Sequence, residues 1–536
     1  MVWCIRFPFL SMKFLLILAL LFISLGLSAQ PQNAFRWANQ VPLHYPSLAT
    51  DLVGNTVVTG SFTHPITVNG KTVAPYGLED VFVGRYSASG QLLWFTHIGG
   101  TGAKATGQDV AIDAGGNAYV AGVFNGTVNQ NVAGTPLTMS DIIYATSYSL
   151  PFLVKIAPTG QTVWARQGKD RSGDIQSTSA VRVAVDPLGN ATIAGYGTST
   201  LTFGSITVGG NRTGIMVHFD AAGTATWGHT FSSSVTTLTR GIGADGSGNT
   251  YLTVRVTGNP FMDGQSIPGP VLTSVILAKF SGSSGALLWA APITNADNTD
   301  LAVDLAGHAT LIGPFSGAAQ FSNRTFTSNS LEVYVARYNP DASLDWVRSL
   351  GALNSGSERI ATNWAGSSIV ALVNTSASPT HAKLLELNTH SGAVTWRQEL
   401  GPGSTSGSNL AISPLEQVYV AGSFSGVLEL GRTTLTSPTG AYFLTRIDRD
   451  PRGNSPHFAD LISCYPNPAM TYLKLKLPAQ YLPARAALFH MSGREVFSQA
   501  LKANETELNL RSVKPGLYTL RVQLPDGALT QQIQVK

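Results

Sequence analysis

Asp109–Gly126 reads DVAIDAGGNAYVAGVFNG, and this stretch decides the fold of the chain. Apolar residues alternate in Val110–Ile112, a turn follows at Asp113–Asn117, and apolar residues alternate again through Phe124. A period of two on either side of a Gly-Asn turn predicts a β-hairpin. A second strand–turn–strand pattern, PFLVKIAPTGQTVW, follows and ends on Trp164. The two hairpins together predict a sheet of four strands.

This pair of hairpins recurs along most of the chain. The turn of the first hairpin occurs in seven copies, which begin at Asp51, Asp113, Asp186, Asp245, Asp304, Asn363 and Ser413. The second hairpin ends on a tryptophan in six copies, at Trp94, Trp164, Trp227, Trp289, Trp346 and Trp396. Repeats of roughly 50–70 residues with four strands each match the blade of a β-propeller. Packing against neighbouring blades covers both faces of each sheet, which explains strands that are apolar on both sides.

The repeated unit, D-x-x-G-N-x-Y-V-A-G and then F-V-x-[RK]-[YF]-x-x-x-G-x-x-x-W, resembles the bacterial β-propeller repeat proteins over about residues 33–450. The resemblance implies an all-β fold with a seven-bladed β-propeller, to which we assign residues 30–450. Propellers host enzymes, adhesins and scaffolds alike, so the fold alone does not determine the function.

The seventh copy ends after the strand Ala441–Ile447, without a tryptophan strand of its own. The segment Phe35–Gln40, which contains Trp37, resembles the fourth strands of the intact copies. A three-stranded last blade would leave an exposed edge. We therefore predict that the strand of Trp37 pairs beside Ala441–Ile447 and closes the ring. Trp37 and the six other repeat tryptophans are expected to dock neighbouring blades through apolar packing.

Residues 1–29 are typical of a secretory signal peptide. Lys13 precedes the apolar run Phe14–Leu27, and cleavage is expected between Ala29 and Gln30. The run is shorter than the roughly 20 residues that span a bilayer, so a membrane anchor is the weaker alternative, and no membrane span is expected after cleavage. Met12 is an alternative start residue.

The composition excludes a disordered chain, because 43% of the residues are hydrophobic and only 12% are charged. Removing residues 1–29 lowers the formal charge from +4 to about +2, which is too small for electrostatic binding of nucleic acid. Cys464 is then the single cysteine, so no internal disulfide is expected. We expect Cys464 to be a buried small hydrophobe rather than a reactive thiol.

The blade pattern ends in a charged linker, residues 451–460, and residues 461–536 show short alternating strands that predict a small Ig-like β-sandwich. This region resembles the type A C-terminal sorting domain of type IX secretion. The matching residues are Tyr465, Pro466, Asn467, Pro468, Gly493, Arg494, Pro515, Gly516, Leu517 and Tyr518. The resemblance implies that the type IX secretion machinery recognises residues 461–536, and that the protein is secreted or lies on the outer-membrane surface.

No pattern in the sequence predicts a catalytic residue, a cofactor or a metal site. The ten histidines lack metal-ligand spacing, and the aspartate turns lack the D-x-D-x-D series of a calcium loop. The turn aspartates are instead expected to accept hydrogen bonds from their own turn amides. The G-x-x-x-W ending also resembles quinone-cofactor propeller dehydrogenases, but the vicinal cysteine pair of many of these enzymes is impossible here.

A basic or potentially basic residue precedes most repeat tryptophans by nine or ten positions, at Arg85, Lys155, His218, Lys279 and Arg337, with Arg446 equivalent in the last copy. The copy with Asn363 in place of the turn aspartate has Glu386 instead. We predict aspartate–basic pairs within blades, such as Asp113–Lys155. A basic ring that binds an anion is the alternative.

The links between the two hairpins of a blade are long and irregular in sequence, at residues 63–79, 125–150, 259–273 and 316–331. They share one face of a propeller with the connections between blades, and variable loops on a rigid scaffold usually carry binding. The sequence therefore predicts a protein that binds a glycan, a protein or another surface component without catalysis. The alternative is a secreted hydrolase or lyase acting on polysaccharide. Carboxylates around the central channel on this face would favour the enzyme, and an aromatic or apolar patch there would favour binding.

Deleting residues 461–536 tests whether this region is only an export signal. We expect the truncated protein to fold with unchanged propeller stability and to accumulate in the periplasm. Residues 463–536 contain no tryptophan, so tryptophan fluorescence during unfolding reports on the rest of the chain. Unimpaired export, or unfolding on deletion, would contradict the assignment.

Overall fold

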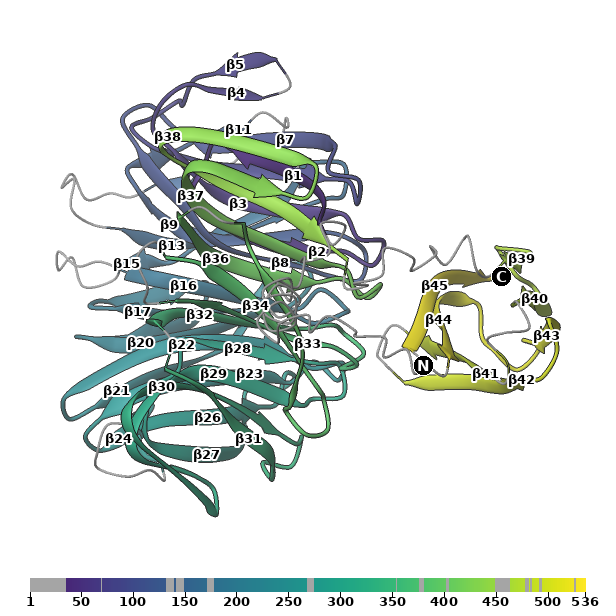
Figure 1. Ribbon diagram of the computed structural model, residues 1–536. Coiled ribbons are helices and arrows are strands. Elements are labelled where there is room, and N and C mark those ends of the chain that lie inside the picture. Colours follow the sequence, from purple (N-terminus) through teal and green to yellow (C-terminus); the bar gives the residue numbers. More distant parts are fainter. Residues whose placement is uncertain are drawn as a thin grey trace, which may run out of the picture.

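The computed structural model describes residues 35–448, except 69, 132–138, 141–148, 171–177, 268–273, 353, 376–379 and 402–403, and residues 463–536, except 478–481, 483, 491–493 and 525–526. The described residues form strands and no helix, which confirms the all-β prediction. Figure 1 draws them as two bodies, one built from strands β1–β38 and the other from β39–β45. No helix in the described part of the chain could cross a membrane. The predicted signal peptide, with Ala29 and Gln30, lies outside the described residues.

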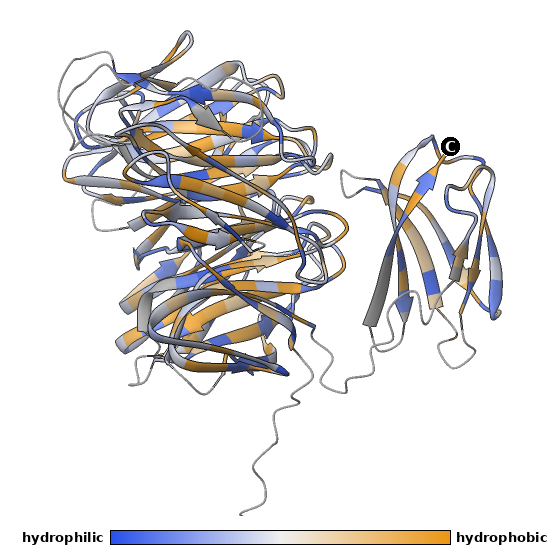
Figure 2. Ribbon diagram, turned by 90° about the horizontal axis from the view of Figure 1, so that it is seen from above, coloured by the Kyte–Doolittle hydropathy of each residue, from blue (hydrophilic) through white to orange (hydrophobic). Residues whose placement is uncertain are grey.

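The first body consists of antiparallel sets of four strands, and Figure 2 shows their hydrophobic residues gathered along the strands. Four sets, each given from the innermost strand outwards, are β2 (His44–Thr50), β3 (Thr56–Phe62), β6 (Asp80–Tyr86) and β7 (Leu92–Gly99); β8 (Lys104–Ile112), β9 (Ala118–Asn125), β13 (Leu150–Ile156) and β14 (Thr162–Gln167); β16 (Thr178–Val185), β17 (Ala191–Gly197), β20 (Thr213–Phe219) and β21 (Ala225–Ser233); and β22 (Thr236–Ala244), β23 (Thr250–Thr257), β26 (Ser274–Phe280) and β27 (Leu287–Ala296).

The remaining sets are β28 (Asp300–Val303), β29 (Ala309–Phe321), β30 (Arg324–Tyr338) and β31 (Leu344–Gly351); β32 (Asn354–Thr362), β33 (Ile369–Asn374), β34 (Ala382–Leu387) and β35 (Val394–Glu399); and β36 (Ser404–Ile412), β37 (Val418–Leu430), β38 (Thr433–Ile447) and β1 (Phe35–Val41). Within the described residues this gives seven sets. The innermost strand of each set contacts that of the next, and β36 contacts β2, so the sets form a closed ring. We number them sets 1 to 7 in chain order.

The ring is closed by its two ends, as the sequence predicted. Strand β1 pairs antiparallel with β38, in a register that places Trp37 opposite Arg446 and Ala38 opposite Thr445. In Figure 1 the purple strand β1 lies against the light green β38. In the other sets the basic position faces its tryptophan in the same way, as Arg85 faces Trp94. The closing strand therefore reproduces the register of an intact repeat.

The tryptophans join each set to the next by a hydrogen bond as well as by packing. The indole N–H of Trp37 donates to the carbonyl of Ala88 at 2.9 Å, and that of Trp94 donates to Pro158 at 2.7 Å. The indoles of Trp164, Trp227, Trp289 and Trp346 donate to the corresponding turns of sets 4 to 6 and of set 3, with distances of 2.8–3.2 Å. We infer that these contacts hold neighbouring sets together. For Trp396 the corresponding turn lies outside the described residues.

The glycine four residues before each tryptophan is required at these contacts. A Cβ on Gly90 would lie 2.5 Å from the Trp37 ring, and one on Gly285 would lie 2.8 Å from the Trp227 ring. Both glycines also have a positive φ, of +85° and +73°. Set 5 has Ala342 at this place, with a φ of +72°. An alanine in this conformation is strained, because its Cβ approaches the backbone.

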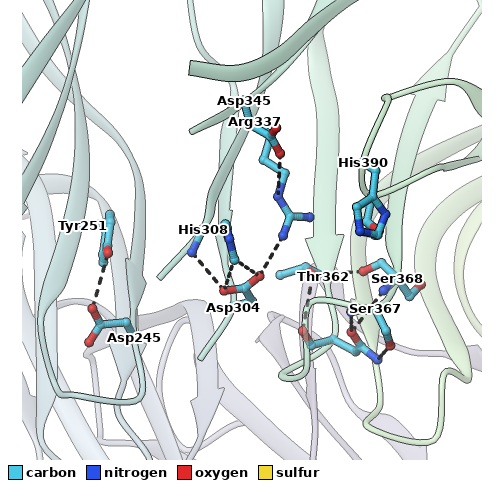
Figure 3. A network of polar contacts seen from close by, with 12 residues as sticks. Asp245, Tyr251, Asp304, His308, Arg337, Asp345, Thr362, Ser367, Ser368 and His390 are labelled. Carbon is cyan, nitrogen blue, oxygen red and sulfur yellow. Dashed lines mark hydrogen bonds and ion pairs between the residues drawn. The ribbon is translucent and has the colours of Figure 1, made fainter. Parts of the chain in front are cut away.

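The turn aspartates act as the sequence predicted. Asp51 accepts hydrogen bonds from the amides of Val53 and Asn55, at 3.0 and 2.8 Å. The predicted ion pairs are present at Arg85–Asp51, Lys155–Asp113, Lys279–Asp245 and Arg337–Asp304. Figure 3 shows Asp304 between His308 and Arg337. All four aspartates are buried, so the pairs are shielded from water rather than solvated.

The predicted pair in set 3 is wrong. His218 Nδ1 lies 2.7 Å from the hydroxyl of Thr226 instead of bonding Asp186, and the ring stacks on Trp227. Burial lowers the pKa of His218, which favours the neutral ring. A neutral imidazole that is shorter than arginine or lysine gains little from reaching the carboxylate.

Two of the links expected to be irregular are in fact regular. Residues 316–331 continue β29 and β30 as one long hairpin, and β37 and β38 extend in the same way. Shorter hairpins form in other links, from β4 (Ile66–Val68) and β5 (Lys71–Val73), β18 (Thr200–Phe203) and β19 (Ile206–Gly209), and β24 (Pro260–Met262) and β25 (Gln265–Ser266). Further short strands are β10 (Thr127–Val128), β11 (Gln130–Asn131), β12 (Met139–Ser140) and β15 (Lys169–Asp170).

The second body is a sandwich of two antiparallel sheets. Its strands are β39 (Ser463–Tyr465), β40 (Tyr472–Lys476) and β43 (Glu505–Asn509) in one sheet, and β42 (Glu495–Leu501), β41 (Ala484–His490), β44 (Gly516–Leu524) and β45 (Gly527–Val535) in the other. The two sheets share one apolar core, which includes Leu475, Leu488 and Leu520. Cys464 is half-buried against this core, and burial raises the pKa of its thiol to about 12. Its thiol is therefore protonated at neutral pH, as expected of a small hydrophobe.

Exchanging alanine and glycine at the docking turns should change the stability of the ring in opposite directions. Ala342→Gly removes the strained conformation and is expected to stabilise the ring by roughly 1 kcal/mol. Gly285→Ala introduces this strain together with a clash against Trp227, and should destabilise the ring by more than that amount. Denaturant midpoints followed by tryptophan fluorescence measure both effects. Destabilisation by Ala342→Gly would contradict this explanation.

Candidate functional site

The innermost strands line a central channel with a regular layering of side chains. Counted back from the turn aspartate or its counterpart, the third residue is apolar in every set and packs against the core, as Val110 and Leu301 do. The second residue is small in every set, namely Ala49, Ala111, Ala184, Gly243, Ala302, Ala361 and Ala411. The fourth residue is the one that varies chemically: Ser47, Asp109, Arg182, Gly241, Asp300, Arg359 and Asn409. The channel therefore has an alanine layer next to a polar layer.

Irregular pairing marks the polar layer. The register shifts between Gly107 and Asp109 in β8, and between Ser179 and Arg182 in β16. Strands β2, β22, β32 and β36 have an irregularity at the equivalent place. A bulge changes the direction of the residues that follow it and interrupts strict alternation. The bulges therefore allow both the apolar core and the polar layer to be satisfied on one strand.

Four charges of the polar layer alternate in sign around the ring, and we call Asp109, Arg182, Asp300 and Arg359 the channel quartet. They belong to sets 2, 3, 5 and 6. Burial lowers the pKa of Arg359, and the nearby charge of Arg182 lowers it further, whereas Asp300 and Asp109 raise it. Charges from three other innermost strands thus reach Arg359, which places the quartet in the channel that these strands share.

The two carboxylates of the quartet are bonded to the channel wall. Asp109 accepts a hydrogen bond from the hydroxyl of Ser47 at 2.8 Å and from the amide of Val183 at 3.0 Å. Asp300 accepts from the amide of Ile360 at 3.0 Å. Both amides belong to the innermost strand of the following set. The carboxylates therefore satisfy N–H groups at the free edge of a sheet, which would otherwise lie unpaired in the channel.

The carboxyl group of Asp300 is affected mainly by its surroundings. Burial raises its pKa, and Arg359 and Arg182 oppose this shift without cancelling it. The ionised form is therefore less favourable in the folded protein than in the unfolded chain.

A small aromatic patch lies where β2 begins, on the face with the long links. Tyr45 is 77% exposed and has a φ of +50°, which is rare for a tyrosine. Its ring lies 6.1 Å from that of Tyr442, and His44 lies 6.0 Å from the same ring. We call His44, Tyr45 and Tyr442 the mouth patch. It lies over the seam where β2 of set 1 contacts set 7. A strained and exposed aromatic residue indicates a binding role rather than a packing role.

A second polar pair lies in set 1 but is enclosed. His97 Nδ1 is 2.9 Å from the carboxylate of Asp80, and both residues are buried. The ring of Tyr76 stacks on His97 with centroids 4.2 Å apart. Asp80 also accepts hydrogen bonds from the amides of Tyr76 and Gly77, so it fixes the first link of the ring. Among the described residues, no group of three or more potential ligands could hold a metal ion.

The sequence analysis named the tryptophans and the sorting motif, and the structure places them away from the channel. The tryptophans lie on the outer strands, apart from the quartet and the mouth patch. Asn467 of the sorting motif bonds β45, and its Oδ1 accepts from the amide of Gln534 at 2.9 Å. Tyr518 donates to the carbonyl of Lys514 at 2.7 Å. Gly493 lies outside the described residues, as does most of the link 125–150.

The sequence analysis did not find the channel quartet or the mouth patch. A signal for the quartet was available, because aligning the seven turns shows that the fourth preceding residue is the one that varies between acidic, basic and neutral types. The mouth patch had no such signal, because Tyr442 and Tyr45 are brought together only by ring closure.

Residues 463–536 match the secretion system C-terminal sorting domain family, and residues 93–127 match the beta-propeller repeat family. The sorting domain is the one read by type IX secretion, so the protein is exported to the extracellular space or the outer-membrane surface. None of the curated proteins matches this sequence.

Similar solved structures include the Dos1 propeller, with 9% identity, a TM-score of 0.38 and coverage of 76% of this chain and 94% of that one. They also include PorZ, an essential bacterial surface component of the type IX secretion system of Porphyromonas gingivalis, with 10% identity, a TM-score of 0.25 and 91% of each chain covered. A PL25 polysaccharide lyase, an ulvan lyase, has 11% identity and a TM-score of 0.38, with 73% of this chain and 92% of that chain covered. At these values the similarities carry no argument about function.

Asp300→Asn should stabilise the ring in a pH-dependent way. The raised pKa of Asp300 means that the wild-type protein loses stability as the pH rises through the folded-state value. Asparagine can still accept from the Ile360 amide but has no charge to bury. The variant should therefore have the higher denaturant midpoint at pH 7 to 8, and the two proteins should converge below the unfolded-state pKa of about 3.9. The exposed substitution Glu429→Gln is the control, and equal midpoints at all pH values would contradict the explanation.

Proposed function

We propose that this protein is a secreted or surface-displayed seven-bladed propeller that binds an extracellular ligand on its long-link face, without catalysis. The mature chain would begin at Gln30, residues 30–450 would form the propeller, and residues 461–536 would carry it through type IX secretion. The ligand is a glycan, a protein or another surface component, and the mouth patch favours a glycan.

The observation that carries the proposal is the conformation of Tyr45. Its side chain is 77% exposed, although an aromatic ring gains free energy from burial. Its backbone is held at a φ of +50° within an irregularity of β2. The neighbouring rings of Tyr442 and His44 supply a rigid support. An exposed ring on a rigid base offers a flat apolar face on which a sugar ring can pack.

The alternative is an enzyme that acts on polysaccharide, and the quartet carboxylates are the observation in its favour. Two aspartates face the central channel, and burial raises the pKa of one of them, Asp300, as a general acid requires. Both carboxylates, however, accept hydrogen bonds from the amides of the next set. This structural use makes binding the better supported function.

Tyr45→Ala tests the binding proposal. A glycan array probed with the full exported chain identifies a ligand, and titration calorimetry then measures its affinity. Loss of one stacked ring should weaken binding about threefold to tenfold. Tyr472→Ala is the matched control, because Tyr472 is an exposed tyrosine of the sorting domain.

Two results would contradict the proposal. One is glycan binding that is unchanged by Tyr45→Ala. The other is depolymerisation of a bound polysaccharide by the wild-type protein, with loss of this activity in Asp300→Asn, which would establish the enzyme instead.

A further inference from the structure

The arginines of the channel quartet differ from its aspartates in how they are engaged. Each aspartate is bonded to a backbone amide of the next set. Arg182, in contrast, donates no hydrogen bond and has no carboxylate within 4.0 Å among the described residues. Arg359 donates through Nη1 to the carbonyl of the adjacent Glu358, at 2.9 Å. Its Nε is buried and has no acceptor.

Unengaged guanidinium donors inside a protein are costly, so they indicate that something else completes them. A guanidinium carries five N–H donors, and a buried donor without a partner loses free energy relative to water. Arg359 and Arg182 also repel one another, which the lowered pKa of Arg359 reflects together with its burial. An anion placed between the two guanidiniums would remove both the repulsion and the missing acceptors.

The position of the two arginines defines the shape of that anion. Arg182 belongs to set 3 and Arg359 to set 6, so they enter the channel from separated parts of a ring of seven. A carboxylate presents two oxygens on one side only. A sulfate or phosphate group presents oxygens in several directions and can accept from two guanidiniums at once.

We propose that Arg182 and Arg359 form a binding site for a tetrahedral oxyanion, a sulfate or phosphate group, in the central channel. The adjacent layer of alanines leaves room for the group that carries the anion. Asp109 and Asp300 hold the walls on either side and limit the site to one anionic group by repelling a second. The site goes beyond the proposed glycan binding and does not depend on Tyr45.

The test measures binding of inorganic sulfate and inorganic phosphate to the full chain by titration calorimetry at low ionic strength, with acetate as the planar comparison. We expect sulfate or phosphate to bind more tightly than acetate. Arg182→Gln and Arg359→Gln should each weaken binding at least about tenfold, because each removes charge-assisted hydrogen bonds. Arg324→Gln, at the exposed tip of the β29–β30 hairpin, should leave binding unchanged.

The conservative variants keep the test valid if the glutamine variants fold poorly. Arg182→Lys and Arg359→Lys keep the charge but lose the planar fork, so they should bind with intermediate affinity. Glucose 6-sulfate and glucose 6-phosphate, compared in the same titration, show which oxyanion ester is preferred. Absence of sulfate and phosphate binding would overturn the proposal. So would affinity that is equal for acetate, or equally reduced by Arg324→Gln.

Discussion

The pairing of β1 with β38 is the interaction on which the rest of the first body depends. A ring of sheets has no edge only if its last sheet is complete, and here the missing strand comes from the other end of the chain. The same strand brings Trp37, whose indole docks on the turn of set 1. Backbone pairing and tryptophan docking therefore close the ring at one place. The closure joins residues about 400 positions apart, so it requires the whole ring to form.

The docking contacts explain why the repeat tolerates change at some positions and not at others. Each joint combines an indole, a turn carbonyl and a glycine whose missing Cβ leaves space for the ring. The turn aspartates add buried ion pairs behind the joint, as Asp304 and Arg337 show. Because a buried charge is costly when its partner is removed, we infer that these pairs fix the orientation of the turns more than they add net stability. Set 3 keeps the joint without the ion pair, so the indole contact is the more basic requirement.

Function in this architecture is confined to the places that the joints do not use. The outer strands and turns are occupied by docking contacts, whereas the inner strands present one variable layer to the channel. The mouth patch lies at the start of one of these strands, beside the closing seam. Both candidate sites therefore rest on strands that the ring holds rigidly, which favours binding with little loss of conformational entropy.

The sequence by itself determined the repeat, the ring and its closure, since these follow from local patterns that recur. A turn aspartate bonds its own amides, a tryptophan follows its glycine by four residues, and the orphan strand of Trp37 is recognised by its likeness to the others. It also determined the destination, through motifs within residues 463–536.

Only the tertiary structure decided which polar residues meet. Arg182 and Arg359 lie 177 positions apart, and nothing local in either strand indicates a common site. The bulges of the inner strands direct these side chains into one channel, and the ring brings them into electrostatic contact. The tertiary structure also overruled local expectation at His218, where burial favours a neutral ring, and at residues 316–331, where backbone pairing continues two strands. Local patterns fix the repeating geometry because they act over a few residues, whereas the chemistry of the channel depends on distances that exist only after the ring has closed.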